Sequence, residues 1–364
     1  MRQLRWAWLC AFSVALCVAS EVSAEAVYRF RYLRMPPGIE GFAVTAANDR
    51  GQMVGEGWRN RDACLLFWES VDATAEVVPL PAIDSIRIRH MNNRGQVVGA
   101  TFIGGGTTRA FMWSRESGYM ELGLPEGADS SFAHGINDSG QVVGMATWWD
   151  PGIWPEQVSQ ATDYGTGAFP IPIRPSIIRP WRWSAEAGMS VLGPQDMLEG
   201  WAMDINDRGE IAGFFTPNES PTVRHAATWT FDGELTVLST PPGVLPRAMA
   251  YSIGKLGQVA GACYDDRGHA GAVFWDRDGV PLQIGPFPGT AARPCDMNDK
   301  GEVIGSWENT ESEYSFLWDR RRGATTLLLP DGAPGTAYTI NDFGLIGGSN
   351  HGGWQPCVWI PCSR

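Results

Sequence analysis

Short apolar segments alternate with turn residues along nearly the whole chain, and the same order of segments recurs. A turn with the consensus Asn-Asp-x-Gly, followed by an apolar run, is found in seven versions, among them AANDRGQMVG from residue 46, INDSGQVVG from residue 136 and MNDKGEVIG from residue 297. The glycine of this turn recurs every 43 to 48 residues, apart from one interval of 69. A repeat of this length is typical of stacked supersecondary units.

Three positions define the repeat. The turn glycines are Gly51, Gly95, Gly140, Gly209, Gly257, Gly301 and Gly344. The asparagines that open the turn are Asn48, Asn92, Asn137, Asn206, Asn298 and Asn341. The tryptophans that end a later apolar segment are Trp68, Trp113, Trp183, Trp229, Trp275, Trp318 and Trp359. The fifth repeat has Gly254-Lys255-Leu256-Gly257 in place of the consensus, so we expect its turn to differ.

Each repeat is expected to form four short strands, called a to d in chain order. Strand a precedes the turn, strand b follows it, strand c ends in tryptophan, and strand d leads into a Pro/Gly bend such as VVPLP at residue 77. Asparagine and glycine together favour a tight a–b turn. A four-stranded sheet of about 45 residues cannot bury its faces alone, and a ring of sheets leaves only short edges. The pattern predicts an all-β, seven-bladed propeller with the tryptophans packed between blades.

The two ends of the chain are offset from the repeat. The last unit stops after strand c at CVWIPCSR, whereas an unaccompanied strand d, YRFRYLRMPPG, begins at residue 28. We therefore expect the segment 27–33 to complete the last blade and to close the ring.

The phrase Ile-Asn-Asp-x-Gly-Gln-Val-Val-Gly, followed by Ala-Phe-x-Trp and Leu-Gly, resembles the repeat of the HAF family of probable extracellular repeat proteins. The resemblance covers nearly all of residues 27–360. It implies an exported bacterial protein with repeats of propeller type, and it implies no catalytic residues.

The N-terminus has the character of a signal peptide. Arg2 and Arg5 precede an uncharged run at 6–19, and Val22-Ser23-Ala24 has small residues where a leader peptidase requires them. We predict cleavage after Ala24, leaving residues 25–364 as one domain in the periplasm or outside the cell. An uncleaved anchor would need a longer apolar run, and bulky Leu16 argues against lipid attachment at Cys17.

The charge excludes one large class of partners. The 364 residues carry a formal charge of -12, and removal of Arg2, Arg5 and Glu21 makes it -13. A nucleic-acid partner is therefore not expected, because that affinity comes mainly from clustered Lys and Arg. No segment after the leader reaches the roughly 20 apolar residues of a membrane span, and we expect a monomer.

Five cysteines follow the leader: Cys64, Cys263, Cys295, Cys357 and Cys362. None has the spacing of a zinc site. Pairing of Cys357 with Cys362 and of Cys263 with Cys295 is a hypothesis only, because spacing does not determine connectivity.

The long interval between turns contains an insertion at about 145–180, between strands b and c of blade three. It is rich in aromatic and proline residues, and its candidate ligand-binding residues are Trp148, Trp149, Trp154 and Tyr164. In a propeller the b–c and d–a loops share one face, so the insertion would overhang that face. Exposed tryptophan and tyrosine suit stacking on sugars or contact with a protein. The alternative is a lid that packs its aromatic side chains on the blades.

The chain contains no familiar catalytic signature. The Asn-Asp turns do not fit a calcium loop, because Arg208 and Lys300 stand where an oxygen ligand is needed. Histidines lie in strand a (His90, His134) or near b–c loops (His225, His269, His351) with nothing that predicts convergence on a metal. Acidic residues expected on the ligand-bearing face are Glu40, Glu126, Asp129, Asp150, Glu199 and Asp265.

Two functions remain open from sequence, and neither calls for a cofactor. The first is a binding or scaffold protein that recognises a glycan, a cell-wall component or a protein through the face with the b–c and d–a loops. The second is a carbohydrate-active enzyme, a glycosidase or lyase, that uses central carboxylates. A surface protein without a small ligand is a third, weaker interpretation.

Overall fold

The computed structural model describes residues 28–60, 62–81, 83–104, 107–149, 176–194, 197–220, 222–244, 246–265, 267–287, 291–310, 312–350 and 355–362. The predicted signal peptide and the middle of the insertion, with Asp150, Trp154 and Tyr164, lie outside these ranges, as does His351. Within them the chain forms strands and turns and no helix, so the all-β prediction is confirmed.

The strands fall into the four predicted positions of the repeat. Those at position a are β2 (Glu40–Ala47), β6 (Ser85–Met91), β10 (Ser130–Ile136), β14 (Met197–Ile205), β18 (Ala248–Ile253), β22 (Ala291–Met297) and β26 (Thr336–Ile340). Those at position b are β3 (Met53–Arg59), β7 (Val97–Ile103), β11 (Val142–Trp149), β15 (Ile211–Pro217), β19 (Val259–Tyr264), β23 (Val303–Glu308) and β27 (Ile346–Ser349).

The outer two positions complete the set. At position c lie β4 (Asp62–Trp68), β8 (Thr107–Ser114), β12 (Ser176–Ser184), β16 (His225–Trp229), β20 (Ala270–Trp275), β24 (Glu313–Asp319) and β28 (Pro356–Pro361). At position d lie β5 (Glu76–Val78), β9 (Gly118–Glu121), β13 (Gly188–Val191), β17 (Leu235–Val237), β21 (Pro281–Gln283), β25 (Gly323–Leu327) and, from the N-terminus, β1 (Tyr28–Tyr32).

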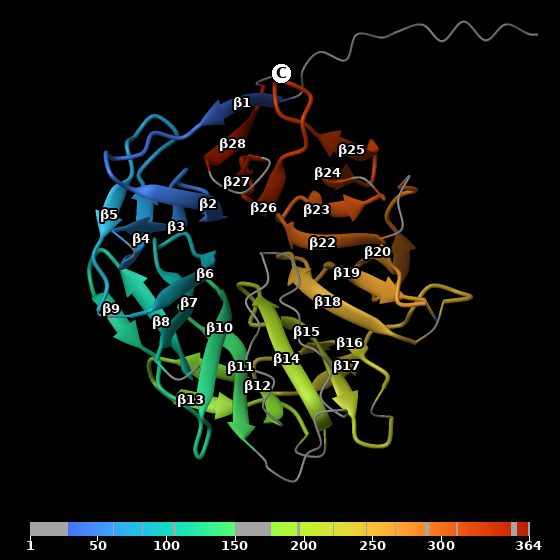
Figure 1. Cartoon of the computed structure of the whole chain (residues 1–364). Helices are drawn as coiled ribbons and strands as arrows, with labels where there is room; N and C mark the ends of the chain where they lie inside the picture. The colour runs from blue at the N-terminus through green and yellow to red at the C-terminus, as the bar shows by residue number, and fades with distance from the viewer. Residues whose placement is uncertain are drawn as a thin grey trace, which may run out of the picture.

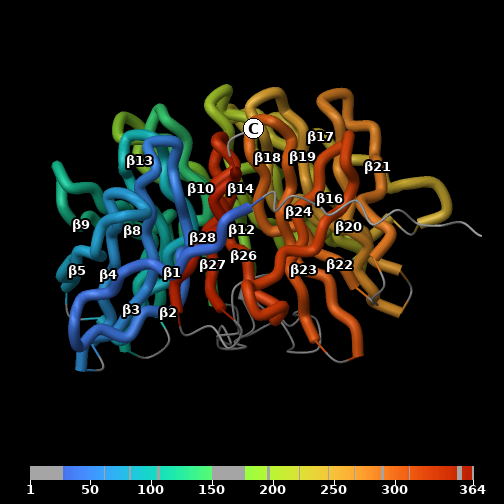
Figure 2. The backbone as a smooth tube through the Cα atoms, turned by 90° about the horizontal axis from the view of Figure 1, so that it is seen from above, coloured from blue at the N-terminus to red at the C-terminus, as the bar shows by residue number. Residues whose placement is uncertain are grey.

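The sheets are arranged around a common centre, with the a strands innermost (Figure 1). Five sheets have four strands in the order a-b-c-d, and β10–β17 form one sheet of eight. The eight strands are joined by a single parallel pair, Ile178 with Glu199. Because neighbouring strands within a repeat are antiparallel, a–b turns and c–d connections lie at one face, here called the turn face. The b–c and d–a connections lie at the other, the loop face; Figure 2 shows the strands running between the two.

The N-terminal strand pairs with the C-terminal one. β1 runs antiparallel to β28 in a sheet ordered β1-β28-β27-β26, with Tyr28 opposite Pro361 and Tyr32 opposite Cys357. The Phe30 ring meets the Trp359 ring edge to face at 5.6 Å. The two ends of the described chain are thus held in one sheet.

Apolar side chains pack mainly between consecutive sheets. One core cluster combines Phe67 of β4 with Phe111 and Trp113 of β8, and another combines Phe274 of β20 with Trp318 of β24. In both pairs a strand-c tryptophan lies against the strand-c phenylalanine of the preceding repeat, at 5.7 and 5.2 Å between ring centres. All seven strand-c tryptophans are buried. Each sheet therefore depends on its neighbours for its core.

The turn asparagine makes four hydrogen bonds. Asn48 Oδ1 accepts from the backbone N–H groups of Arg50 and Gln52, both at 3.1 Å. Its Nδ2 donates to Gln52 Oε1 at 2.9 Å and to the backbone carbonyl of Asn92, in the next repeat, at 3.1 Å. The turn glycines meanwhile adopt φ between 74° and 85°, which glycine tolerates best. The hydrogen bonds of the asparagine and the positive φ of the glycine explain why the turn sequence is Asn-x-x-Gly-Gln.

The bond from asparagine to the next repeat recurs around the centre. Equivalent bonds run from Asn92 to Asn137, from Asn137 to Asn206, from Asn206 to Gly254, from Asn298 to Asn341 and from Asn341 back to Asn48. We call this series the asparagine belt. It links residues 293 positions apart in sequence, so it holds the ends of the ring together as well as its neighbours.

The fifth repeat interrupts the belt without changing the turn. Gly257 has φ 85°, and Gly254 N–H donates to the Gln258 carbonyl at 2.9 Å, as at the asparagine positions. The expected difference in turn geometry is therefore wrong. What is missing is the side chain: Gln258 Oε1 is buried and accepts no hydrogen bond among the described residues.

Two further expectations are corrected. The insertion does not begin at 145 or end at 180, because β11 continues to Trp149 and β12 begins at Ser176, and these two residues pair. The proposed disulfides are also wrong, since all five cysteines of the described chain are free thiols. Burial raises the pKa of the Cys263 thiol to about 12, so it behaves as an inert core side chain.

Among the residues that the structure describes, there is no helix with the length and apolar character needed to cross a membrane.

Deleting residues 28–32 should destabilise the protein, because β28 loses five paired residues and Trp359 loses its edge contact with Phe30. We expect the free energy of unfolding in urea to fall by roughly 3 kcal/mol or more. Arg29→Ala, an exposed position on the same strand, is the control and should change little. A truncated protein as stable as the whole chain would show that β1 is dispensable.

Gly254→Asn should stabilise the protein by restoring the belt. The new amide would reach Gln258 Oε1 and the Asn298 carbonyl, and an ideal Cβ at residue 254 lies no closer than 3.3 Å to any neighbour. Gly254→Ala is the matched control, because it restricts the unfolded backbone similarly but adds no amide. In chemical denaturation we expect the asparagine variant to exceed the alanine variant by roughly 1–3 kcal/mol. An alanine variant of equal or greater stability would contradict this account.

Candidate binding site in the central channel

Two small cavities follow one another along the central axis. The outer cavity, about 120 Å³, opens at the turn face and is lined by turn residues of the repeats. The inner cavity, about 80 Å³, lies further toward the loop face. Four residues line both: His90, Asp204, Asp296 and Thr339. We call these four the neck.

A bulge in every a strand brings the neck residues to the axis. The register of the a–b pairing shifts at one corresponding point in all seven repeats, for example between Ile88 and His90 in β6 and between Ala337 and Thr339 in β26. A β-bulge puts an extra residue into one strand and re-aims the side chains beside it. As a result, two consecutive residues of a single strand, such as Tyr338 and Thr339, both line the inner cavity.

The neck aspartates connect neighbouring repeats. Asp204 Oδ2 accepts from Ser252 Oγ and from the Ile253 N–H, both at 2.9 Å, and Oδ1 accepts from the Ile205 N–H at 2.8 Å. Asp296 accepts from the N–H groups of Met297 and Ile340 at 2.8 Å, and the Ser252 hydroxyl, which donates its proton to Asp204, lies 3.5 Å from Asp296 Oδ1. The two carboxylates are thus oriented by backbone donors, with one hydroxyl between them.

The neck brings two carboxyl groups close to an imidazole. Burial raises the pKa of Asp296 to about 6, against the opposing effect of His90 nearby. The His90 ring is fixed through Nδ1, which lies 3.1 Å from the Ile136 carbonyl. A carboxylate pair and an imidazole therefore share a narrow, polar space.

A second acidic feature surrounds the outer cavity. The residue after each turn asparagine or its glycine replacement lies there, and the set is Asp49, Asn93, Asp138, Asp207, Lys255, Asp299 and Asp342. We call this set the aspartate ring. Most members accept, through Oδ1, the N–H of the corresponding residue in the preceding repeat, as Asp342 does from Asp299 at 2.7 Å. Burial, and after it the charge of Asp299, raises the pKa of Asp342. The mouth of the channel at the turn face is accordingly anionic.

The loop-face side of the channel is aromatic and cationic instead. The Trp201 ring stacks on His134 at 5.6 Å and on Phe214 at 5.7 Å, within an apolar cluster that extends from β7 to β22. Guanidinium groups lie over this cluster, with Arg89 5.3 Å from the Phe132 ring and Arg224 5.6 Å from the Phe214 ring.

Two ion pairs are buried in the same part of the molecule. Arg87 binds Glu56 at 3.0 Å, and their side chains are 6% and 1% exposed. Arg224 binds Glu199 at 3.3 Å, and Glu199 also accepts from Trp201 Nε1 at 2.8 Å. Arg87 of β6 pairs with Glu56 of the preceding repeat, whereas Arg224 and Glu199 belong to one repeat, so these charges tie strands together in the interior.

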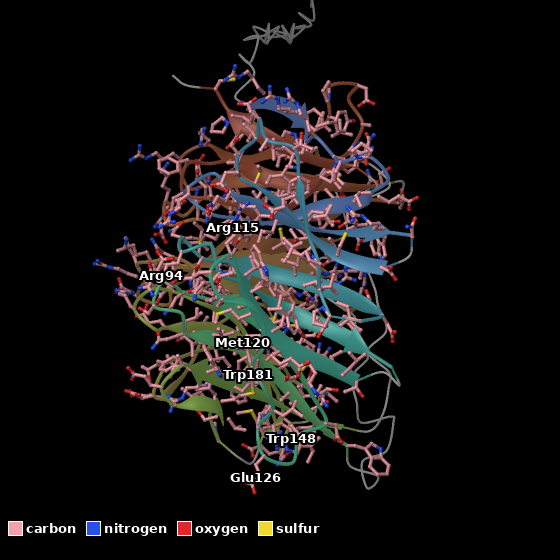
Figure 3. All side chains as sticks on the ribbon, turned by 90° about the vertical axis from the view of Figure 1, so that its left-hand side faces the viewer. Arg94, Arg115, Met120, Glu126, Trp148 and Trp181 are labelled. Atoms are coloured by element: carbon pink, nitrogen blue, oxygen red, sulfur yellow. The ribbon has the colours of Figure 1, made fainter. Side chains whose placement is uncertain are left out.

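The predicted ligand-binding tryptophans separate into two environments. Trp148 is half-buried and donates from Nε1 to the Glu126 carbonyl at 3.0 Å, and Figure 3 shows the two side by side at the margin of the molecule, away from Arg94 at the turn face. Trp149 is 56% exposed, with its backbone N–H held by Asp129. Trp148 therefore matches the packing alternative, and Trp149 offers an open indole.

The predicted acidic residues do not converge. Glu40, Glu126, Asp129, Glu199 and Asp265 are absent from the lining of both axial cavities. Asp204 and Asp296 both precede the turn asparagine by two residues, where the sequence suggested only the first position of a calcium loop; that they line the channel was not predicted. Of the predicted histidines, His90 and His134 do line the inner cavity, while His269 forms an exposed pair with Asp265.

No three His, Cys, Asp or Glu side chains of the described ranges are grouped closely enough to hold a metal ion directly. The asparagine and aspartate oxygens of the turns accept backbone N–H groups.

A wider groove, about 910 Å³, lies on the turn face near the two ends of the described chain. Its lining alternates cations such as Arg277, Lys300 and Arg321 with anions such as Asp276 and Glu302. The groove therefore presents no single sign of charge to a ligand.

No protein-family model matches the sequence, and no curated protein matches it significantly. Solved structures do resemble the fold. An oligogalacturonate lyase in complex with manganese aligns with a TM-score of 0.56 at 10% identity, over 93% of this chain and 97% of the lyase. YCF48 bound to D1 peptide aligns with a TM-score of 0.53 at 12% identity, over 93% and 97%.

A prolyl endopeptidase also aligns, with a TM-score of 0.54 at 11% identity, over 82% of this chain. The chain spans only 44% of that peptidase. At these identities the likeness establishes a β-propeller fold and nothing about activity.

Arg87→Met should be strongly destabilising, because it removes a buried cation that lies 3.0 Å from the buried Glu56 carboxylate. We expect a loss of about 3–5 kcal/mol in the free energy of unfolding, measured by urea denaturation. Arg31→Met, which breaks an exposed pair with Asp72, should cost less than about 1 kcal/mol. Equal effects of the two substitutions would show that the protein does not depend on this buried ion pair.

Proposed function

We propose that this chain is an exported seven-bladed β-propeller of the HAF-repeat type. The eight-stranded sheet counts as two blades in this proposal, because one parallel residue pair joins its halves. The pairing of β1 with β28 supports the idea that the N-terminal strand completes the last blade. Cleavage near Ala24 would release the protein into the periplasm or the extracellular space, as a monomer.

Its proposed role is binding or scaffolding, with a glycan, a cell-wall component or a protein recognised at the loop face. The observation that carries this proposal is Trp149, an indole 56% exposed on a backbone held by Asp129. Its strand pairing with Ser176 fixes it at the base of the insertion, on the loop face. An exposed, positioned tryptophan supplies a large contact area at small entropic cost, as at binding hot spots.

The alternative of a glycosidase or lyase with central carboxylates has less support. Asp204 and Asp296 line both axial cavities, but these cavities measure only about 120 and 80 Å³. Ligand sites typically enclose roughly 300–1,000 Å³, and a glycosidase must place a sugar between its two carboxylates. The β-propeller fold occurs in both enzymes and binding proteins, so only the residues of the site can distinguish between the two functions.

The binding role is tested by Trp149→Ala in pull-down and titration against a panel of polysaccharides and isolated cell wall. We expect the variant to lose at least tenfold in affinity for whichever component the native protein retains, since hot-spot tryptophans contribute about 2 kcal/mol or more. Phe343→Ala is the matched control, because Phe343 is 66% exposed but lies on the turn face. Unchanged binding in Trp149→Ala, or loss in Phe343→Ala alone, would contradict a loop-face site.

The same panel separates the two functions. Reducing-end release or unsaturated products from any polysaccharide, abolished in Asp204→Asn or Asp296→Asn, would replace the binding role with the enzymatic one.

A further inference from the structure

The wide groove on the turn face has charges of both signs in its wall, but they are not equally available to a ligand. The groove measures about 910 Å³. Its cations are Arg277, Lys300, Arg320, Arg321 and Arg322, and its anions are Asp276, Asp278, Glu302 and Asp319. What the groove can bind depends on which of these charges the protein already uses.

Two of the anions are used by their own turns and by one arginine. Asp319 Oδ1 accepts the backbone N–H groups of Arg321 and Arg322 at 2.8 and 2.9 Å. Glu302 accepts from Asn298 Nδ2 at 2.8 Å and from Arg322 Nη2 at 3.1 Å. The Arg322 guanidinium also pairs with the Asp319 carboxylate. These contacts neutralise Asp319, Glu302 and Arg322 among themselves.

A third anion is used in the turn between β20 and β21. Asp276 Oδ1 accepts the N–H groups of Asp278 and Val280 at 3.1 and 2.9 Å. Asp278 is thus the one anion of the lining that no such contact holds. It lies 3.8 Å from Arg277 Nε, and both side chains are more than 70% exposed, so this pair is weak.

Three cations of the lining have no partner of opposite charge. Lys300, Arg320 and Arg321 are exposed and form no ion pair within the ranges that the structure describes. Their backbones are nevertheless fixed, because Asn298 Oδ1 accepts the Lys300 N–H at 3.1 Å and Asp319 accepts that of Arg321. The groove therefore offers three unpaired cations, carried on ordered turns.

The fold does not require these arginines. The chain has a formal charge of -12, yet Arg320-Arg321-Arg322 is its only run of consecutive cations. The same turn between strands c and d is Ser-Arg-Glu-Ser-Gly in the second repeat and Ser-Ala-Glu-Ala-Gly in the third. All three turns end in a glycine with φ between 68° and 75°. Because the turn forms with one arginine or none, the triplet needs another explanation.

The chemistry and the size of the groove indicate what would bind. A guanidinium matches the paired oxygens of a carboxylate or a phosphate, and a lysine adds a point charge. Lys300 comes from one turn and Arg320 and Arg321 from another, so a ligand with several anionic groups would meet them together. A volume of about 910 Å³ is also in the range of roughly 300–1,000 Å³ that encloses an organic ligand rather than a single ion.

We propose that this groove binds an oligoanion, a ligand with two or more neighbouring carboxylate or phosphate groups, through Lys300, Arg320 and Arg321. The site is separate from loop-face recognition, because the groove lies on the turn face. Its cations are exposed, so binding should weaken as the salt concentration rises.

The test is isothermal titration of the full-length chain, in Tris buffer of low ionic strength, with two probes. Tripolyphosphate supplies neighbouring phosphates and a uronic acid trisaccharide supplies neighbouring carboxylates, so the tighter probe identifies the source of the charge. We expect one site per chain for at least one probe. Maltotriose, a neutral trisaccharide, should not bind.

Arg320→Gln combined with Arg321→Gln should lower the affinity at least tenfold, because it removes two of the three unpaired cations. Arg50→Gln combined with Arg94→Gln is the matched control. It removes the same charge from exposed turn-face positions outside the groove, one of them visible in Figure 3. The control should bind the probes like the native protein.

Three results would overturn the proposal. The first is that neither probe binds, and the second is that maltotriose binds as well as the anions do. The third is an equal effect of the two double variants, whether both weaken binding or neither does, because attraction would then come from the surface as a whole.

Discussion

The hydrogen bond from a buried asparagine side chain to the next repeat is the interaction on which the rest of the structure depends. The same amide closes its own turn and donates across the sheet boundary, as Asn48 does to Asn92. One side chain therefore ties the turn to the neighbouring sheet in six of the seven repeats, although the turn itself also forms with Gly254 in place of asparagine. Because a sheet of four short strands has no core of its own, losing this coupling would leave the packing of tryptophans between sheets without a fixed register.

The turn asparagine is nearly constant among the repeats, whereas the a-strand residue two positions before it varies. The asparagine fixes where the chain approaches the axis, and the bulge two to three residues earlier decides which side chains reach it. At these positions the repeats differ freely, with His90, Asp204, Asp296 and Thr339 in equivalent or neighbouring places. The side chains that line the channel are thus the ones that differ from repeat to repeat. Function, in such a molecule, has to be sought where the repeat is broken.

Sequence reasoning succeeded where one residue has one local task. A turn is predicted by Asn48, a positive φ by Gly51 and a large buried side chain by Trp68. With these positions fixed in each repeat, its four strands could be placed. It failed where the outcome depends on partners distant in sequence. Cys263 and Cys295 do not form a disulfide. The ends of the insertion belong to β11 and β12, because Trp149 pairs with Ser176. The neck was missed for the same reason: the sequence shows that Asp204 precedes its turn by two residues, but not that it meets His90 and Thr339 of other repeats.

The two ends of the channel differ in chemistry, and the difference follows from strand direction. Every a strand starts at the loop face, and along its middle its side chains pack on those of the b strand, as Trp201 of β14 does on Phe214 of β15. Every a strand ends at the turn face, where backbone N–H groups need acceptors and aspartates such as Asp342 supply them. Carboxylates therefore collect at the turn face because the turns require them, whereas aromatic side chains such as Trp201 are buried between the strands.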